Sequence, residues 1–76
     1  MQEMRQIEYA LLTYWKGYPN AVESLEDIAR LWLPQAPLEQ IEAALKRLVR
    51  AGRVEVVPKK NRPPMYRYRK ASEGAD

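Results

Sequence analysis

The sequence predicts a mainly α-helical domain with a small β-hairpin, in which three helices precede two strands. Three observations lead to this prediction. Apolar residues recur every three or four positions through roughly the first 50 residues, as they do along one face of a helix. After Gly52 the period changes to two, which is typical of a strand. Proline and glycine separate the periodic segments, where they signal turns.

The first helix is expected from about Gln2 to Trp15. Its apolar stripe consists of Met4, Ile7, Leu11, Tyr14 and Trp15. Gly17 is a plausible helix stop. Glu8 falls inside the stripe, and we expect it where the stripe meets solvent, since a buried carboxylate would need a partner.

The second helix is expected to begin after Ser24. This serine precedes Asp27 by three residues, which is close to the capping-box pattern. The buried side is expected to consist of Leu25, Ile28, Ala29 and Trp32. Pro34 should end the helix, because the residue before a proline is pushed out of helical geometry.

The third helix is expected to follow the short turn 34–36, with Pro37 at its first position and Gly52 at its end. Its predicted buried stripe is Leu38, Ile41, Leu45, Leu48 and Val49. Its predicted outward residues are Glu39, Ala43, Lys46, Arg47 and Arg50. Two amphipathic helices joined by a short turn form a helix-turn-helix.

Two strands should follow, over residues 53–57 and 65–69, and a stiff basic loop over residues 58–64 should join them. In the second strand, Tyr66 and Tyr68 are expected on one face and Arg67 and Arg69 on the other.

Composition sets further limits. The 76 residues allow one domain, expected over residues 1–70, with a flexible tail over residues 71–76. Neither Cys nor His occurs, so disulfides, zinc sites with S or N ligands, and catalysis by either residue are excluded. No apolar run approaches the roughly 18 residues of a membrane span, and no signal peptide opens the chain. We therefore expect a cytoplasmic protein with no membrane partner.

The charges divide unevenly along the chain. Residues 1–45 carry three basic and seven acidic groups, a net charge of −4, whereas residues 46–70 carry ten basic groups and one acid, a net charge of +9. A positive segment of this kind is typical of a surface that meets a polyanion.

The order of helix, helix-turn-helix and two-stranded hairpin resembles the winged-helix DNA-binding domains of bacterial and archaeal regulators. Residues 25–29 and 41–55 are similar to the helix, the leucine-rich recognition helix and the following Leu-x-x-x-Gly-x-Val junction of MarR-like and PadR-like repressors. Residues 62–68, Arg-Pro-Pro-Met-Tyr-Arg-Tyr, resemble the Arg- and Pro-rich wing and its Tyr-x-Tyr return strand. The resemblance spans roughly residues 5–70.

This resemblance implies a small regulator of transcription that binds double-stranded DNA, with the third helix in the major groove and the basic wing on the backbone. The nucleic-acid-binding residues that it implies are Gln40, Ala43, Lys46, Arg47, Arg50, Arg53, Lys59, Lys60, Arg62, Arg67 and Arg69. Most of these contacts should be to phosphates, which outnumber base contacts in protein–DNA complexes.

Other interpretations remain open. Basic residues at a helix end complement the helix dipole, and charged strands discourage edge-to-edge aggregation. Glu39 lies on the part of the third helix that should enter the groove, where an acid repels phosphate, although Glu can accept a hydrogen bond from cytosine. The main alternative is a winged helix that binds a protein through the acidic N-terminal half, and a third is RNA binding. Tyr9 and Leu12 lie off the first helix's stripe and suggest a homodimer contact.

We expect no enzyme, no metal and no cofactor. Ser24, Glu26 and Asp27 sit at a helix start with no second cluster to complete a site, so capping accounts for them. We expect four large aromatic residues in the core: Tyr14, Trp15, Trp32 and Tyr68. Tyr66 could belong to either the core or the binding surface.

Overall fold

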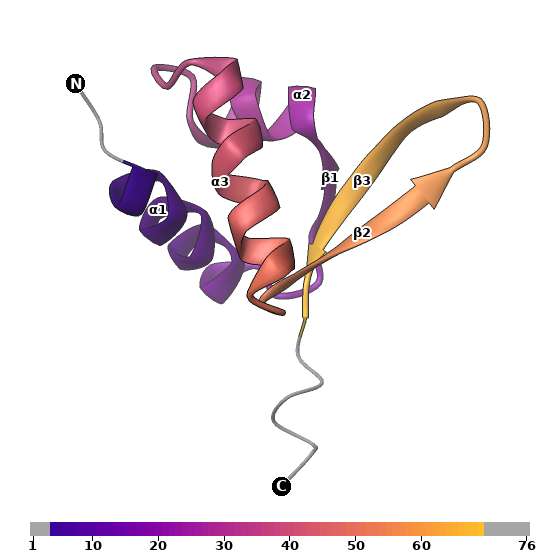
Figure 1. Ribbon diagram of the computed structural model, residues 1–76, viewed down its shortest axis with the longest axis horizontal. Helices are drawn as coiled ribbons and strands as arrows, with labels where there is room; N and C mark the ends of the chain where they lie inside the picture. The colour runs from indigo at the N-terminus through magenta and orange to yellow at the C-terminus, as the bar shows by residue number, and fades with distance from the viewer. Residues whose placement is uncertain (1–3, 70–76) are drawn as a thin grey trace, which may run out of the picture.

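The computed structural model describes residues 4–69, in which three helical segments and a three-stranded antiparallel sheet enclose one core (Figure 1). The elements are α1 (Met4–Gly17), β1 (Val22–Ser24), α2 (Leu25–Asp27), η1 (Ile28–Trp32), α3 (Leu38–Arg50), β2 (Val54–Lys59) and β3 (Arg62–Tyr68). The predicted flexible tail, residues 71–76, lies outside the described residues. None of the helices within residues 4–69 has the length and apolar character needed to cross a bilayer.

The stripe predicted for α1 is confirmed. Ile7, Leu11 and Trp15 are buried, and Met4 and Tyr14 pack partly buried against them. The helix continues to Gly17, two residues past the predicted end, and the Tyr18 N–H still donates to the Tyr14 carbonyl at 3.0 Å. The predicted start, Gln2, lies outside the described residues.

The second helical segment begins as predicted and then widens. Ser24 is the N-cap, and its Oγ accepts a hydrogen bond from the Asp27 N–H at 3.2 Å. From Ile28 the chain forms a π-helix, in which the Leu33 N–H donates to the Ile28 carbonyl at 3.1 Å. The apolar spacing alone did not predict this wider turn. Leu33 then leaves helical geometry, which confirms the stop before Pro34.

The predicted start of α3 was wrong by one residue. Pro37 is the N-cap, with an extended backbone (φ −62°, ψ 140°), and the helix begins at Leu38. The φ of proline suits both positions, so the sequence could not separate them. Leu38 was also wrongly assigned to the buried stripe, since it is 47% exposed, and Ala44 is fully buried instead. Ala44 was not predicted because the buried stripe was identified from the spacing of large apolar residues, and alanine is small.

The end of α3 agrees with the prediction. Gly52 adopts φ +80°, its N–H donates to the Val49 carbonyl at 3.0 Å, and the Arg53 N–H donates to the Leu48 carbonyl at 2.9 Å. These two bonds form a Schellman motif, which closes the helix and turns the chain directly into β2.

The prediction of a two-stranded hairpin was incomplete, because the sheet has three strands in the order β1-β3-β2. β1 pairs antiparallel with β3, and Val22 lies opposite Arg67 and Ser24 opposite Met65. A strand of three residues is too short to show alternation, and its partner lies more than 40 positions later. The sequence pattern therefore could not reveal it.

The predicted seven-residue loop was also wrong, since strands extend through most of it. Lys59 pairs with Arg62, so the turn consists of Lys60 and Asn61, and Asn61 adopts φ 63°, which asparagine tolerates. Pro63 and Pro64 fit into β3 because β1 pairs only with residues 65–67, which leaves an open edge beside them. The hairpin consequently projects away from the helices as a long, paired arm (Figure 1).

The aromatic side chains pack as predicted. The Trp15 indole is fully buried and donates from Nε1 to the Ala21 carbonyl at 3.1 Å. The Tyr14 ring stacks on Trp32 with centroids 3.9 Å apart, and Trp15 meets Trp32 edge-on. Tyr66 is only 9% exposed and belongs to the core, which decides between its two assignments.

Candidate nucleic-acid interface

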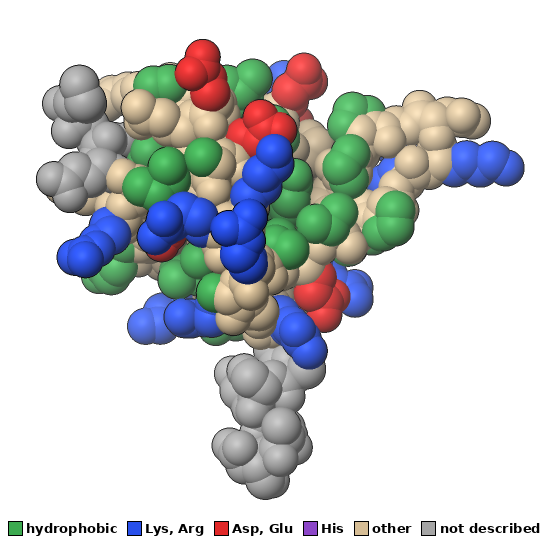
Figure 2. Space-filling model, viewed as in Figure 1, with side chains coloured by type: hydrophobic (Ala, Val, Ile, Leu, Met, Phe, Trp, Pro, Cys, Tyr) green, Lys and Arg blue, Asp and Glu red, His purple; other side chains and the backbone are tan. Residues whose placement is uncertain are grey.

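The C-terminal half of α3 presents the first group of basic side chains, here called the α3 basic cluster: Lys46, Arg47, Arg50 and Arg53. All four are exposed. Lys46 and Arg50 are four residues apart and so share one face of the helix, and the Schellman turn at Gly52 places Arg53 directly after it. Figure 2 shows Lys and Arg side chains gathered over the lower part of α3 and the neighbouring part of α1.

Two members of this cluster form ion pairs. Arg47 donates from Nε to a carboxylate oxygen of Glu8 on α1, and the Glu8 side chain is only 19% exposed. Glu8 therefore has the partner that its place in the stripe requires. Lys46 Nζ lies 4.0 Å from Glu42 Oε2, one turn earlier on α3. Arg50 and Arg53 make no ion pair within residues 4–69 and remain available to an external anion.

The second group, here called the hairpin tip, comprises Lys59, Lys60 and Arg62. All three are exposed, and no acid of the described chain pairs with them. The strand register shifts between Val57 and Lys59, so the tip follows an irregularity at Pro58. The tip lies far from α3 at the free end of the hairpin, where a basic side chain is visible in Figure 2.

The remaining two predicted arginines share one acidic partner, Glu55. Tyr66 and Tyr68 face the core, so the alternation of β3 places Arg67 on the opposite face of the sheet. There Arg67 Nε donates to Glu55 Oε1 at 2.9 Å, and Arg69 Nε lies 3.9 Å from Glu55 Oε2. Their charges are partly balanced by Glu55. Arg69, however, also lies beside the end of α3, because its N–H donates to the Arg53 carbonyl at 3.0 Å and its Nη1 lies 3.8 Å from where a Cβ of Gly52 would stand.

The N-terminal half of α3 has a different character. Gln40 and Ala43, two of the predicted site residues, are half-buried. Glu39 and Glu42 are exposed there, and acidic side chains stand above the basic ones in Figure 2. The exposed face of α3 thus changes from acidic to basic along its length.

Tyr66 connects the hairpin to α3 electrostatically. Burial raises the pKa of its phenol, and the negative charge of Glu42 raises it further. Its hydroxyl thus stays protonated beyond the usual range.

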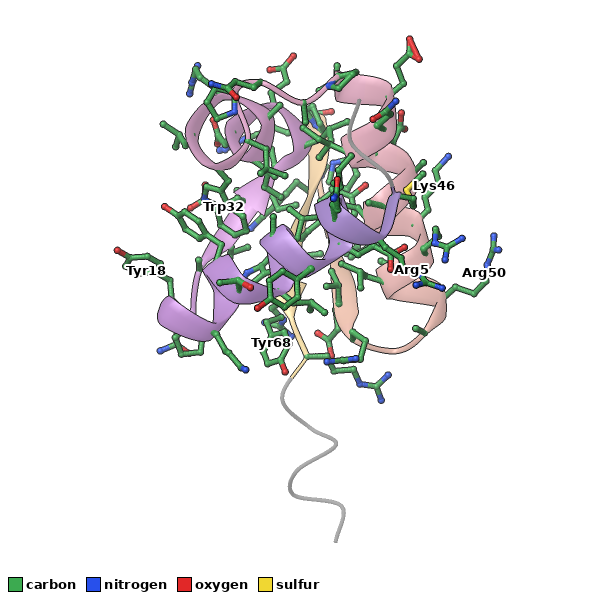
Figure 3. All side chains as sticks on the ribbon, turned by 90° about the vertical axis from the view of Figure 1, so that its left-hand side faces the viewer. Arg5, Tyr18, Trp32, Lys46, Arg50 and Tyr68 are labelled. Carbon is green, nitrogen blue, oxygen red and sulfur yellow. The ribbon has the colours of Figure 1, made fainter. Side chains whose placement is uncertain are left out.

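Sequence reasoning missed Arg5. It is exposed on α1 and makes no ion pair with residues 4–69. Figure 3 shows Arg5, Lys46 and Arg50 extending to the same side of the molecule. The sequence could have indicated Arg5 as a site residue, because it lies one turn before Tyr9 on the outer face of the first helix.

The protein was compared with family models, curated proteins and solved structures, and none of them matches it. The function is therefore inferred from the residues of this chain.

Proposed function

We propose that this protein is a small winged-helix protein that binds double-stranded DNA and regulates transcription. The main support is a set of exposed basic side chains that have no acidic partner within residues 4–69. They lie at two separate places, the end of α3 and the hairpin tip: Arg50, Arg53, Lys59, Lys60 and Arg62. A duplex offers phosphates on both sides of a groove, so two separated groups of cations suit it better than one compact patch.

The paired hairpin supports this proposal. A wing contacts the backbone usefully only if it holds its position, because ordering a flexible loop on binding costs free energy. The tip here is joined by two strands whose base is anchored by β1 and by the buried Tyr66. The tip residues are thus held out from the core by a paired structure.

Because the exposed face of α3 changes from acidic to basic, its two halves would contact different parts of the DNA. In the major groove, the basic C-terminal half would approach phosphates, and the acidic N-terminal half would face base edges. Glu39 and Glu42 would then favour cytosine, whose N4 group is a donor. Much of the affinity would come from backbone contacts and little from base readout.

The test is fluorescence anisotropy of a labelled random-sequence duplex across a salt series. We expect the log–log slope to indicate about three or more displaced counterions, since each phosphate contact contributes roughly −0.9. The absence of binding at low salt by a folded protein would overturn the proposal. An A-form RNA duplex of equal length is the matched competitor, and stronger binding to it would favour RNA as the ligand.

The opposite end of the molecule favours a second candidate function, which is docking to a protein. Leu31 is 59% exposed and Leu38 is 47% exposed, and both belong to the acidic half of the chain together with Glu26 and Glu39. Apolar side chains near acids suit a basic partner surface. Reversing Glu26 and Glu39 to Lys would leave DNA affinity unchanged or raise it, and would abolish function in vivo only if this end recruits a protein.

A further inference from the structure

The outer face of α1 carries an exposed aromatic side chain that the core does not use. Tyr9 is 73% exposed, and Leu12, three residues later on the same side of the helix, is half-buried. The opposite side of α1 supplies Ile7, Leu11 and Trp15 to the core. Tyr9 is therefore not among the side chains of the core, whereas Leu12 packs partly buried against the core and stays partly exposed.

Three shallow hollows meet at Leu12. The first lies along the N-terminal part of α1 and is lined by Arg5 and Tyr9, the second lies between α1 and the end of α3, and the third lies towards β3 beside Lys16 and Tyr68. Leu12 lines all three, and together they are here called the Leu12 surface.

The rim of the Leu12 surface is positive. Its rim residues are Arg5, Lys16, Arg50 and Arg53, none of which pairs with an acid within residues 4–69. Glu8 also lines the depression, but Arg47 engages its carboxylate. An apolar centre inside a ring of cations needs a ligand with both an apolar face and negative flanks.

We propose that the Leu12 surface binds a short acidic amphipathic helix of a partner protein. An aliphatic side chain of that helix would fill the depression over Leu12 and beside Tyr9, and Asp or Glu residues on its flanks would pair with the rim. Apolar burial supplies affinity in this arrangement, and the charges supply orientation and selectivity.

The same charges argue against a second copy of this chain. A two-fold dimer through the Leu12 surface would bring like patches together, so the rim cations of one copy would oppose those of the other. A nucleic acid fits less well too, since phosphates pair with the rim but leave Tyr9 and Leu12 uncovered. Peptide binding does not require DNA binding, but Arg50 and Arg53 belong to both surfaces, so the two ligands would compete for them.

The test is an NMR titration of the ¹⁵N-labelled protein with a synthetic helical peptide of about 14 residues, which carries leucines on one face and glutamates on both flanks. We expect the largest shift changes at the amides of Tyr9, Leu12 and Arg53. A peptide of identical composition, with its leucines scattered around the helix, should bind at least about tenfold more weakly, which corresponds to about 1.4 kcal/mol.

Two variants complete the design. Tyr9→Ser should weaken peptide binding about tenfold or more, and its exposed position leaves the fold intact. Tyr18→Ser is the matched control, because Tyr18 is also an exposed tyrosine, 60% accessible, outside the Leu12 surface.

Several results would overturn the proposal. These are no shift at Tyr9 and Leu12 with millimolar peptide, equal binding of the scattered-leucine peptide, or equal loss in the two tyrosine variants. A dimer in sedimentation equilibrium that Tyr9→Ser dissociates would assign the surface to a second copy. Duplex DNA that perturbs Tyr9 and Leu12 as strongly as the peptide would assign it to nucleic acid.

Discussion

Arg47 on α3 donates from Nε to the carboxylate of Glu8 on α1, which joins two residues 39 positions apart in the sequence. The pair holds one arginine of the α3 basic cluster against the helical core and lowers its availability to phosphate. The cations at the end of α3 are therefore unequal: Arg47 is engaged within the protein, whereas Arg50 and Arg53 make no ion pair within residues 4–69.

Replacing Glu8 by glutamine should raise DNA affinity. The variant releases the Arg47 guanidinium from its counter-charge, and the salt dependence should steepen by up to about 0.9 if Arg47 then contacts a phosphate. The pair is partly exposed, so stability should fall by no more than about 1 kcal/mol. Salt-series anisotropy measures the first effect and urea unfolding the second.

Glu55→Gln is the matched control for this experiment. It also removes one negative charge, but the arginines that it releases are Arg67, on the sheet face that points away from the core, and Arg69. If Glu8→Gln and Glu55→Gln raise DNA affinity equally, net charge explains the effect and the position of Arg47 does not matter.

Neutralising the hairpin tip should reduce the number of displaced counterions. In the triple variant Lys59→Gln, Lys60→Gln and Arg62→Gln, the log–log slope should become shallower by about 2 to 3, because each lost phosphate contact removes roughly 0.9. All three side chains are exposed and lack acidic partners within residues 4–69, so unfolding should be little changed. The single variant Arg67→Gln should keep the original slope, because Arg67 pairs with Glu55 on the sheet face opposite the core. An unchanged slope in the triple variant would remove the tip from the interface.

Alanine should have opposite effects at two glycines. Gly52 adopts φ +80°, and an added Cβ would meet nothing closer than Arg69 at 3.8 Å, so Gly52→Ala should destabilise the protein by about 1 kcal/mol through backbone strain alone. Gly17 ends α1 with open space around the Cβ position, so Gly17→Ala should be neutral or stabilising by up to about 1 kcal/mol. Urea unfolding of both variants tests this contrast, and equal effects of either sign would contradict it.

Tyr66 should make stability fall in alkaline solution. Its folded-state pKa lies above the 10.0 of a free tyrosine, chiefly because of burial. The unfolded chain therefore releases the phenol proton first as pH rises, so the stability contributed by the neutral phenol is complete below about pH 10 and is lost as pH rises towards the folded pKa. The free energy of unfolding of Tyr66→Phe, measured from pH 8 to 11, should decline less steeply than that of the wild type. Parallel declines would show that Tyr66 ionises alike in both states.

Much of the fold could be predicted from short-range patterns. The stripes of α1 and α3, the Ser24 cap and the Gly52 turn each depend on residues within a few positions of one another. The strand β1, the length of the hairpin and the exposure of Leu38 could not be predicted, because each depends on contacts with distant segments. The π-helix was missed for another reason, since its apolar spacing is compatible with an ordinary helix.

The candidate site divides in the same way. Its basic residues were all visible in the sequence, but Arg67 and Arg69 were grouped with the others although both pair with Glu55. Arg5 was omitted, although it extends to the same side as Arg50 (Figure 3).

The sequence by itself determined the helices, the hairpin and the concentration of positive charge after residue 45. Local backbone preferences and the spacing of apolar side chains act over a few residues, so they can be read along the chain. Only the tertiary structure decided which cations are balanced, that the tip stands apart from α3, and that Leu12 lies within a positive rim. Ion pairing and exposure depend on which side chains meet in space, and packing brings those together from positions as distant as Glu8 and Arg47.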